Sequence, residues 1–302
     1  MTFEEFAEEI VTGMKEQFRT LEIRQEYVKK LQGQSYHGLI LKEPGAEAGV
    51  SIDLDRYYRE TENGLSTEKV IEKLCGDILH MDLRPPVIDV ESLRDYEKMK
   101  RGLMLQLVPV KGNEEMLSGV PFRRILDMAV VYRFLVDEGG MEGSILLTEE
   151  NIRAFGIPAK KLDADAVSVC LDRHPVSVRT MASVLFGSGE EEYGIPDLWV
   201  VGNDTGRYGA AVIAYPDTLE KVAERLGGGY YLIPSSIHEM LAIRDRGEMR
   251  AGDLDRMIVN VNETEVAPED RLTDHCYHYD PDRRLLEPGT EYEKRRSITL
   301  PV

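Results

Sequence analysis

The sequence is poor in cysteine, with only Cys75, Cys170 and Cys276 in 302 residues. Their number is odd, their spacing is wide, and no two of them form a CxxC pair. These features exclude a disulfide framework and a zinc ribbon. Cys75 lies within a helical stripe of apolar residues, which favours a role as a small core side chain. We therefore expect a reduced protein of the cytoplasm.

Long apolar runs and positive charge are also scarce. No stretch approaches the ~18 apolar residues that a bilayer crossing requires, and the acidic, periodic N-terminus is unlike a signal or transit peptide. The chain has 37 Lys and Arg against 55 Asp and Glu, a formal net charge of −18. Such a surface repels phosphate backbones and anionic lipids, which excludes general nucleic-acid binding and membrane-surface binding. The basic cluster 294–296 is the exception.

The residues that are present predict an α+β protein. Hydrophobic residues make up 42% of the chain, enough for a sizeable core. A strand-strand-helix pattern recurs over four ranges, 36–80, 128–156, 198–227 and 230–262. We expect mixed or antiparallel sheets with helices packed on one face, preceded by one long helix over residues 2–31. A doubly wound parallel fold would need single strands alternating with helices.

A small, acidic stretch, Gly187–Gly194, is the best candidate for a linker. It divides the chain into an N-terminal α+β lobe, residues 1–188, and a C-terminal α+β lobe, residues 189–302. One continuous domain is the alternative.

The stretch 230–245 places a short polar corner between two apolar runs. Its candidate catalytic residues are His238 and Glu239, which follow two serines. A zinc-protease HExxH motif would need a second histidine where Ala242 stands, and the strand-turn-helix context of a serine nucleophile is missing. The alternative is structural, with the serines satisfying backbone groups at an interruption of the strand.

Residues 274–280 contain the densest set of potential ligands. If this segment is a strand, alternation puts Asp274, Cys276, His278 and Asp280 on one face, where Asp274, His278 and Asp280 are the candidate metal ligands. One strand supplies two or three ligands at most, so other residues would have to complete the site. The alternative is a buried strand with packing aromatics. We predict no cofactor, with a divalent metal at this face as the alternative.

Four segments together resemble one known family. They are Val120-Pro-Phe-Arg-Arg-Ile-Leu-Asp-Met-Ala-Val-Val-Tyr-Arg, Gly202-Asn203 with the residues after it, Leu232-Ile-Pro-Ser-Ser-Ile-His-Glu, and Asp274-His-Cys-Tyr-His-Tyr-Asp. The chain resembles an uncharacterised bacterial domain family that is common in clostridial gut bacteria. The last segment departs from the family pattern at Thr273 and Cys276, where the family has serine and valine. The valine implies a core position for Cys276, and the family implies no activity.

The motifs favour a binding function, because none has the spacing that a known chemistry requires. We expect a non-enzymatic cytoplasmic protein that binds an unknown protein partner or assembles with itself. One alternative is a hydrolase, with or without a metal, that uses the corner 238–239 and the cluster 274–280. Another is a small-molecule sensor with a cleft beside the corner.

Overall fold

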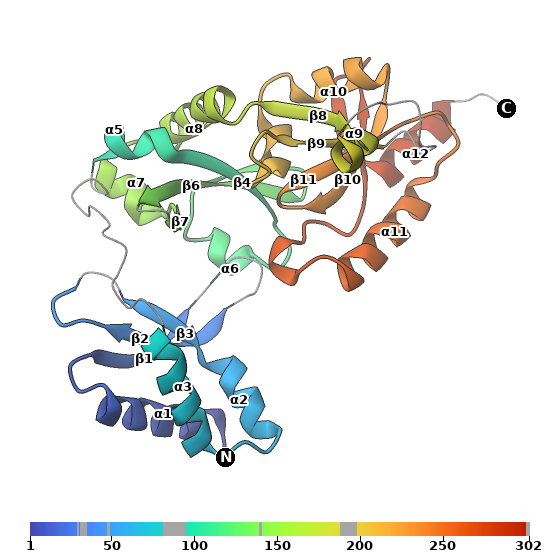
Figure 1. Ribbon diagram of the computed structural model, residues 1–302. Helices are drawn as coiled ribbons and strands as arrows, with labels where there is room; N and C mark the ends of the chain where they lie inside the picture. The colour runs from blue at the N-terminus through green and yellow to red at the C-terminus, as the bar shows by residue number, and fades with distance from the viewer. Residues whose placement is uncertain are drawn as a thin grey trace. The chain divides into compact units, whose positions relative to one another are not determined.

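The computed structural model describes residues 1–28, 30, 35–46, 49–80, 95–138, 141–187 and 198–299. The chain forms two compact units (Figure 1). Unit 1 comprises residues 1–90 and 137–141, and unit 2 comprises residues 91–136 and 142–302. Within the described ranges, no helix has both the length and the apolar character that crossing a membrane demands.

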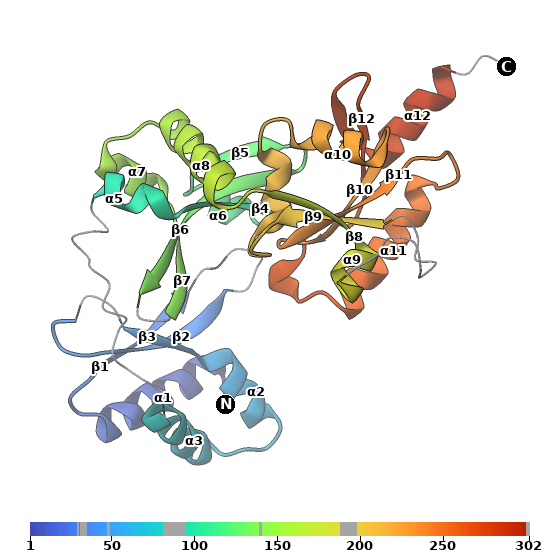
Figure 2. The same cartoon turned by 45° about the horizontal axis from the view of Figure 1, so that its top comes forward.

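Unit 1 has a three-stranded antiparallel sheet of order β1-β2-β3. Its elements are α1 (Phe3–Gln17), β1 (Glu22–Val28), β2 (Tyr36–Lys42), β3 (Val50–Asp53), α2 (Leu54–Glu62) and α3 (Thr67–His80). A capping box begins α1, in which the Thr2 side chain accepts from the backbone of Glu5 and the Glu5 side chain accepts from the backbone of Thr2. The apolar sides of α1 and α3 pack on one face of the sheet and form a separate core (Figure 2).

The expected long N-terminal helix is wrong. The helix ends at Gln17, and residues 22–28 instead form β1, which pairs with β2 along its whole length. Only Ile23 of β1 is buried, so the strand has little of the alternation that identifies a strand in a sequence. Pairing with β2, the next strand along the chain, decides the conformation.

Unit 2 contains two sheets. A four-stranded sheet has the order β4-β6-β5 with β7 also pairing with β6, and a six-stranded sheet has the order β13-β12-β10-β11-β9-β8. The strands are β4 (Leu103–Pro109), β5 (Phe122–Ile125), β6 (Met128–Glu138), β7 (Met141–Leu146), β8 (Val176–Thr180), β9 (Leu198–Asn203), β10 (Tyr230–Ser236), β11 (Glu239–Arg244), β12 (Tyr277–Asp280) and β13 (Leu285–Pro288). The pairs whose register is described are all antiparallel, which confirms the α+β prediction.

The helices of unit 2 cover both faces of the six-stranded sheet. They are α5 (Tyr96–Met99), η2 (Lys100–Gly102), α6 (Glu114–Leu117), α7 (Glu149–Phe155), α8 (Ala159–Arg173), α9 (Met181–Phe186), η3 (Gly209–Ala214), α10 (Thr218–Leu226), α11 (Ala251–Thr264), η4 (Pro268–Asp270) and α12 (Gly289–Thr299). One large core joins η3 and α10 to one face and also includes α8, which packs on β4 of the four-stranded sheet, and a smaller core joins α11 to the other face. Our expectation of helices on a single face does not hold for this sheet.

The range 198–227, predicted to contain two strands and a helix, does not form a hairpin. Its second apolar run is the 3-10 helix η3, and all six of its residues are buried. A short apolar run reads the same in a buried strand and in a buried helical turn. Gly209, which begins η3, allows this close packing, because a Cβ atom there would lie 2.4 Å from the carbonyl oxygen of His238.

The two units divide the chain differently from the lobes 1–188 and 189–302. Strand β8 precedes residue 188 and pairs with β9, which follows it, so a boundary there would split one sheet. Residues 188–194 of the expected linker lie outside the described residues.

Candidate functional site

A hollow of about 370 Å³ in unit 2 is the best candidate for a functional site. It lies where three parts of the chain meet: the turn after β4, the turn between β5 and β6, and the segment that leads into β12. Its lining residues are Pro109, Lys111, Gly112, Asp127, Leu272, Thr273, Asp274 and His275. The volume is that of a small-molecule site.

The turn between β5 and β6 presents Asp127 to this hollow. Leu126 precedes it with a φ of 55°, in the left-handed region that a bulky residue seldom adopts. Arg124 Nε donates to the Leu126 carbonyl at 2.8 Å, and the Val110 backbone donates to the Asp127 carbonyl at 2.9 Å. These bonds hold the turn in a strained conformation, which is a common feature of functional sites.

Both carboxylate oxygens of Asp127 contact the segment before β12. Tyr277 donates its hydroxyl to Oδ1 at 2.6 Å, and His275 Nε2 lies 3.4 Å from Oδ2. The carboxylate raises the pKa of His275. Burial would raise the pKa of Asp127, but the contacts from His275 and Tyr277 outweigh it and hold that pKa below its usual range. The pair is therefore an ionised carboxylate beside an imidazole that favours its charged form.

The hollow carries charges of both signs. Lys111 and His275 contribute positive charge, and Asp127 and Asp274 contribute negative charge. The His275 side chain is about one-third exposed, and within the described ranges no residue hydrogen-bonds its Nδ1 atom. Nδ1 is therefore available to a ligand while Asp127 holds the ring from the other side.

His278 and Asp280 lie on β12 while Asp274 lies in the bend before it, and each of the three candidate metal ligands has a partner of its own. Asp274 accepts a hydrogen bond from Asn262 Nδ2 at 2.9 Å. Asp280 accepts one from Arg295 Nη2 at 3.0 Å. The Cys276 thiol packs in the core against α11, where burial raises its pKa, and this fits the core position that the family pattern implies.

His278, the remaining candidate ligand, lies beneath α12. Its ring stacks on Tyr292 with centroids 3.4 Å apart, and its Nε2 lies 3.3 Å from Asp245 Oδ2. Asp245 also accepts hydrogen bonds from the Tyr292 hydroxyl at 2.7 Å and from the Gly247 backbone at 2.8 Å. The contact with His278, with these two bonds, holds the pKa of Asp245 well below its usual range. This buried group fastens α12 to the sheet.

The corner at 238–239 lies elsewhere on the same sheet. His278 pairs with Tyr231 at the start of β10, whereas His238 lies in the turn that follows β10, roughly 20 Å along the strand at ~3.3 Å per residue. The structure therefore keeps His278 away from the corner. Throughout the described part of the chain, no three His, Cys, Asp or Glu side chains group as metal ligands would.

The corner itself is a strand with a bulge followed by a tight turn. β10 continues through Ser236, its register with β11 shifts after Pro234, and Ile237 and His238 form the turn. His238 Nδ1 accepts a hydrogen bond from the Tyr208 backbone at 3.3 Å, and Nε2 lies 3.5 Å from Asp270. These contacts assign the Nε2-protonated tautomer to His238 and give it a role in holding the loop before η3.

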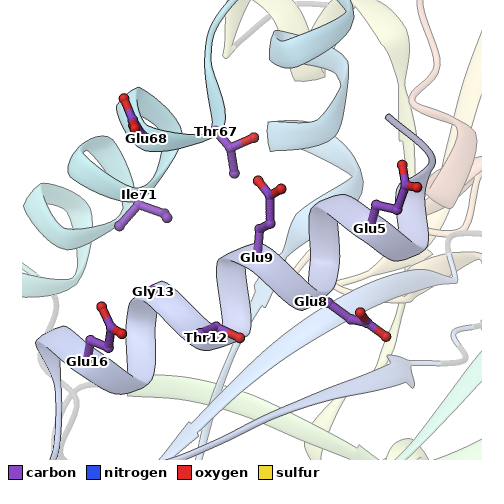
Figure 3. A pocket seen from close by; sticks show the side chains of 9 residues that line it. All are labelled: Glu5, Glu8, Glu9, Thr12, Gly13, Glu16, Thr67, Glu68 and Ile71. Atoms are coloured by element: carbon purple, nitrogen blue, oxygen red, sulfur yellow. The ribbon is translucent and has the colours of Figure 1, made fainter.

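Unit 1 has a hollow of its own, about 510 Å³, between α1 and α3. Figure 3 shows glutamates along α1 and Glu68 at the start of α3 around it, with Ile71 facing Gly13. A Cβ atom on Gly13 would lie 2.5 Å from Ile71 Cδ1, so the glycine lets the two helices approach closely. In the described part of the chain these carboxylates do not group as metal ligands would, so we explain them as a solvated acidic surface.

Asp127 and the hydroxyl of Tyr277 were not among the candidate functional groups predicted from the sequence. Asp127 lies in a turn without glycine or asparagine, so turn chemistry does not identify it. The available signal was the resemblance, since Asp127 belongs to the first of the four quoted segments and Tyr277 to the last. The hydrogen bond between them joins residues 150 positions apart.

Comparison with known proteins identifies a family. No curated protein and no solved structure matches the chain. Residues 3–281, which include every residue of the hollow, match a family described as a family of unknown function, DUF5688. That range covers most of both units and confirms the resemblance to a family of unknown function. The chain therefore belongs to the family DUF5688.

Proposed function

We propose that the protein is a non-enzymatic binding protein that holds a small polar ligand in the hollow at Asp127 and His275. The observation that carries the proposal is the fixed ring of His275, which Asp127 contacts through Nε2 while Nδ1 has no partner among the described residues. A ligand acceptor at Nδ1 would complete the hydrogen bonding of a charged imidazole.

The charges around the hollow suggest the class of ligand. Lys111 and His275 suit a carboxylate, and Asp274 suits an ammonium group. A free amino acid carries both groups and is small enough for about 370 Å³. We therefore propose a zwitterion of this size as the ligand.

Calorimetric titration with glycine and with glutamate, at pH 6 and at pH 8, tests the proposal. The raised pKa of His275 keeps the ring charged at pH 6, so we expect the wild type to bind more tightly there than at pH 8. The substitution His275→Gln should weaken binding at pH 6 about tenfold, the equivalent of one charge-assisted hydrogen bond, and should abolish the pH dependence.

The matched control is His80→Gln, which changes an exposed histidine of α3 in unit 1. It should bind as the wild type does. Equal affinities in wild type and His275→Gln at both pH values would reject the hollow as the binding site.

A further inference from the structure

Arg133, on β6, is a partly buried cation that has no carboxylate partner among the described residues. Its Nε donates to Ser144 Oγ at 2.9 Å, and its Nη1 donates to Gln106 Oε1 at 3.0 Å. Among the described residues, no Asp or Glu lies within ion-pair distance of it. Arg123, on the neighbouring strand β5, does have a carboxylate partner, because its Nε lies 3.1 Å from Asp163 Oδ1.

The remaining guanidinium nitrogen, Nη2, is available to bind a ligand. It donates no hydrogen bond to any residue in the described ranges, and it is not among the fully enclosed polar atoms that lack a partner. Ser144 and Gln106 therefore hold the guanidinium in one orientation, in which Nη2 is not fully enclosed. Desolvation also lowers the pKa of Arg133, because burial disfavours its charge. An anion would offset that cost.

A tyrosine and a second arginine stand beside Arg133. The guanidinium of Arg133 lies 5.6 Å from the centroid of the Tyr208 ring, and that of Arg207 lies 5.4 Å from it. The Tyr208 hydroxyl is 3.3 Å from Ser144 Oγ. The ring is stacked on His238, and the Tyr208 backbone is held in the left-handed region, with a φ of 52°. Two positive groups are thus held around one aromatic ring.

We propose that Arg133, with Tyr208 and Arg207, forms a second binding site, for the oxyanion of a ligand. A guanidinium presents parallel N–H groups that match carboxylate and phosphate oxygens. The site is separate from the hollow at Asp127. Asp127 and Arg133 are six positions apart in and beside the same strand, roughly 20 Å at ~3.3 Å per residue. The proposed site brings Arg133, from the first quoted segment of the family pattern, beside Arg207 and Tyr208, from the loop after Gly202.

Titration with potassium phosphate and with potassium acetate, each against potassium chloride at equal ionic strength, tests the site in the full chain. We expect saturable binding of at least one oxyanion and none of chloride. Preference between phosphate and acetate then identifies the ligand group. Arg133→Lys keeps the charge but loses the fork, and it should weaken binding about tenfold or more, the equivalent of one charge-assisted hydrogen bond.

Arg256→Gln is the matched control, since Arg256 is an exposed arginine of α11 and its loss changes the net charge by one. It should bind the oxyanion as the wild type does. The same affinity in Arg133→Lys as in wild type, or no binding beyond that of chloride, would overturn the site.

A measurement on the wild type guards against a variant that fails to fold. The Nε–Hε resonance of Arg133 in a nitrogen-proton NMR spectrum should shift with phosphate or acetate and saturate at the calorimetric affinity. Movement confined to the resonances of other arginines would contradict the proposal.

Discussion

At the scale of single residues, Asp127 links the turn between β5 and β6 to the segment before β12. Its carboxylate accepts a hydrogen bond from Tyr277 and contacts His275. The two ionisable partners shift in opposite directions, the pKa of Asp127 downward and that of His275 upward. Each shift favours the charged form, so the stability of unit 2 is linked to pH through this pair.

The substitution Asp127→Asn tests this linkage. A raised folded pKa means that His275 contributes stability fully below its unfolded pKa, near ~6.5, and loses it as the pH rises through the folded value. A lowered folded pKa means that Asp127 contributes above its unfolded pKa, near ~3.9, and loses that contribution on acidification. The pair should therefore stabilise most between roughly pH 4 and pH 6.5.

Urea denaturation of wild type and Asp127→Asn at pH 5.5 and pH 8 provides the measurement. We expect the variant to lose about 1 kcal/mol at either pH, because the hydrogen bond from Tyr277 is no longer made to a charged acceptor, and more at pH 5.5 than at pH 8. The pH-dependent part should be small because both side chains are partly exposed and screened. Asp172→Asn, at an exposed position of α8, is the control and should show no such difference. A larger loss at pH 8 would contradict the linkage.

The predictability of these residues differs for a physical reason. The alternation of residues 276–279 follows from strand geometry, and the structure places Cys276 and His278 on one face and Tyr277 and Tyr279 on the other. The partner of each side chain does not follow from local pattern. Asp127 meets Tyr277 only because β6 and β12, far apart in the sequence, begin at the same place.

At the scale of elements, α12 is fastened to the six-stranded sheet by polar contacts as well as by packing. Tyr292 stacks on His278 and donates its hydroxyl to Asp245. Burial, with the Asp245 hydrogen bond, raises the pKa of Tyr292 to about 12, so the hydroxyl keeps its proton at neutral pH. Arg295 and Arg296, part of the basic cluster in the sequence, form ion pairs with Asp280, Glu287 and Asp245. These ion pairs offset the positive charge of both arginines within unit 2.

The substitution Tyr292→Phe should release α12 selectively. It keeps the ring that stacks on His278 but removes the hydrogen bond to a buried carboxylate, a loss of about 1.5–3 kcal/mol. Hydrogen exchange measured by mass spectrometry should show faster exchange in peptides of α12 than in those of α8. Tyr27→Phe, at an exposed position of β1, should leave both unchanged. Equal exchange of α12 in wild type and Tyr292→Phe would show that the hydroxyl contributes nothing to its docking.

At the scale of the whole molecule, the chain divides into two units that each have a core. The core of unit 1 is formed by α1, α3 and the three-stranded sheet, and the large core of unit 2 by both of its sheets with α8, η3 and α10. Cooperative unfolding follows contiguous cores. We therefore expect a substitution in one core to destabilise mainly the unit that contains it.

The substitution Leu74→Ala, in the core of unit 1, should cost about 2–5 kcal/mol because it leaves a cavity at a fully buried position. Hydrogen exchange should lose protection in unit 1 while the protection of β4 and β10 stays as in wild type. The reciprocal variant is Leu162→Ala, in the core of unit 2, which should show the opposite pattern. Equal loss of protection in both units in either variant would show that they unfold as one.

The α+β class, the start of the first helix and the alternation of residues 277–280 could be predicted from the sequence alone. These properties depend on neighbours a few residues apart. The strand at 22–28, the helical turn at 209–214 and the candidate sites at Asp127 and Arg133 became visible only in the folded chain. Those outcomes depend on pairing and burial between separate segments of the chain, for which the periodicity within one segment carries no signal.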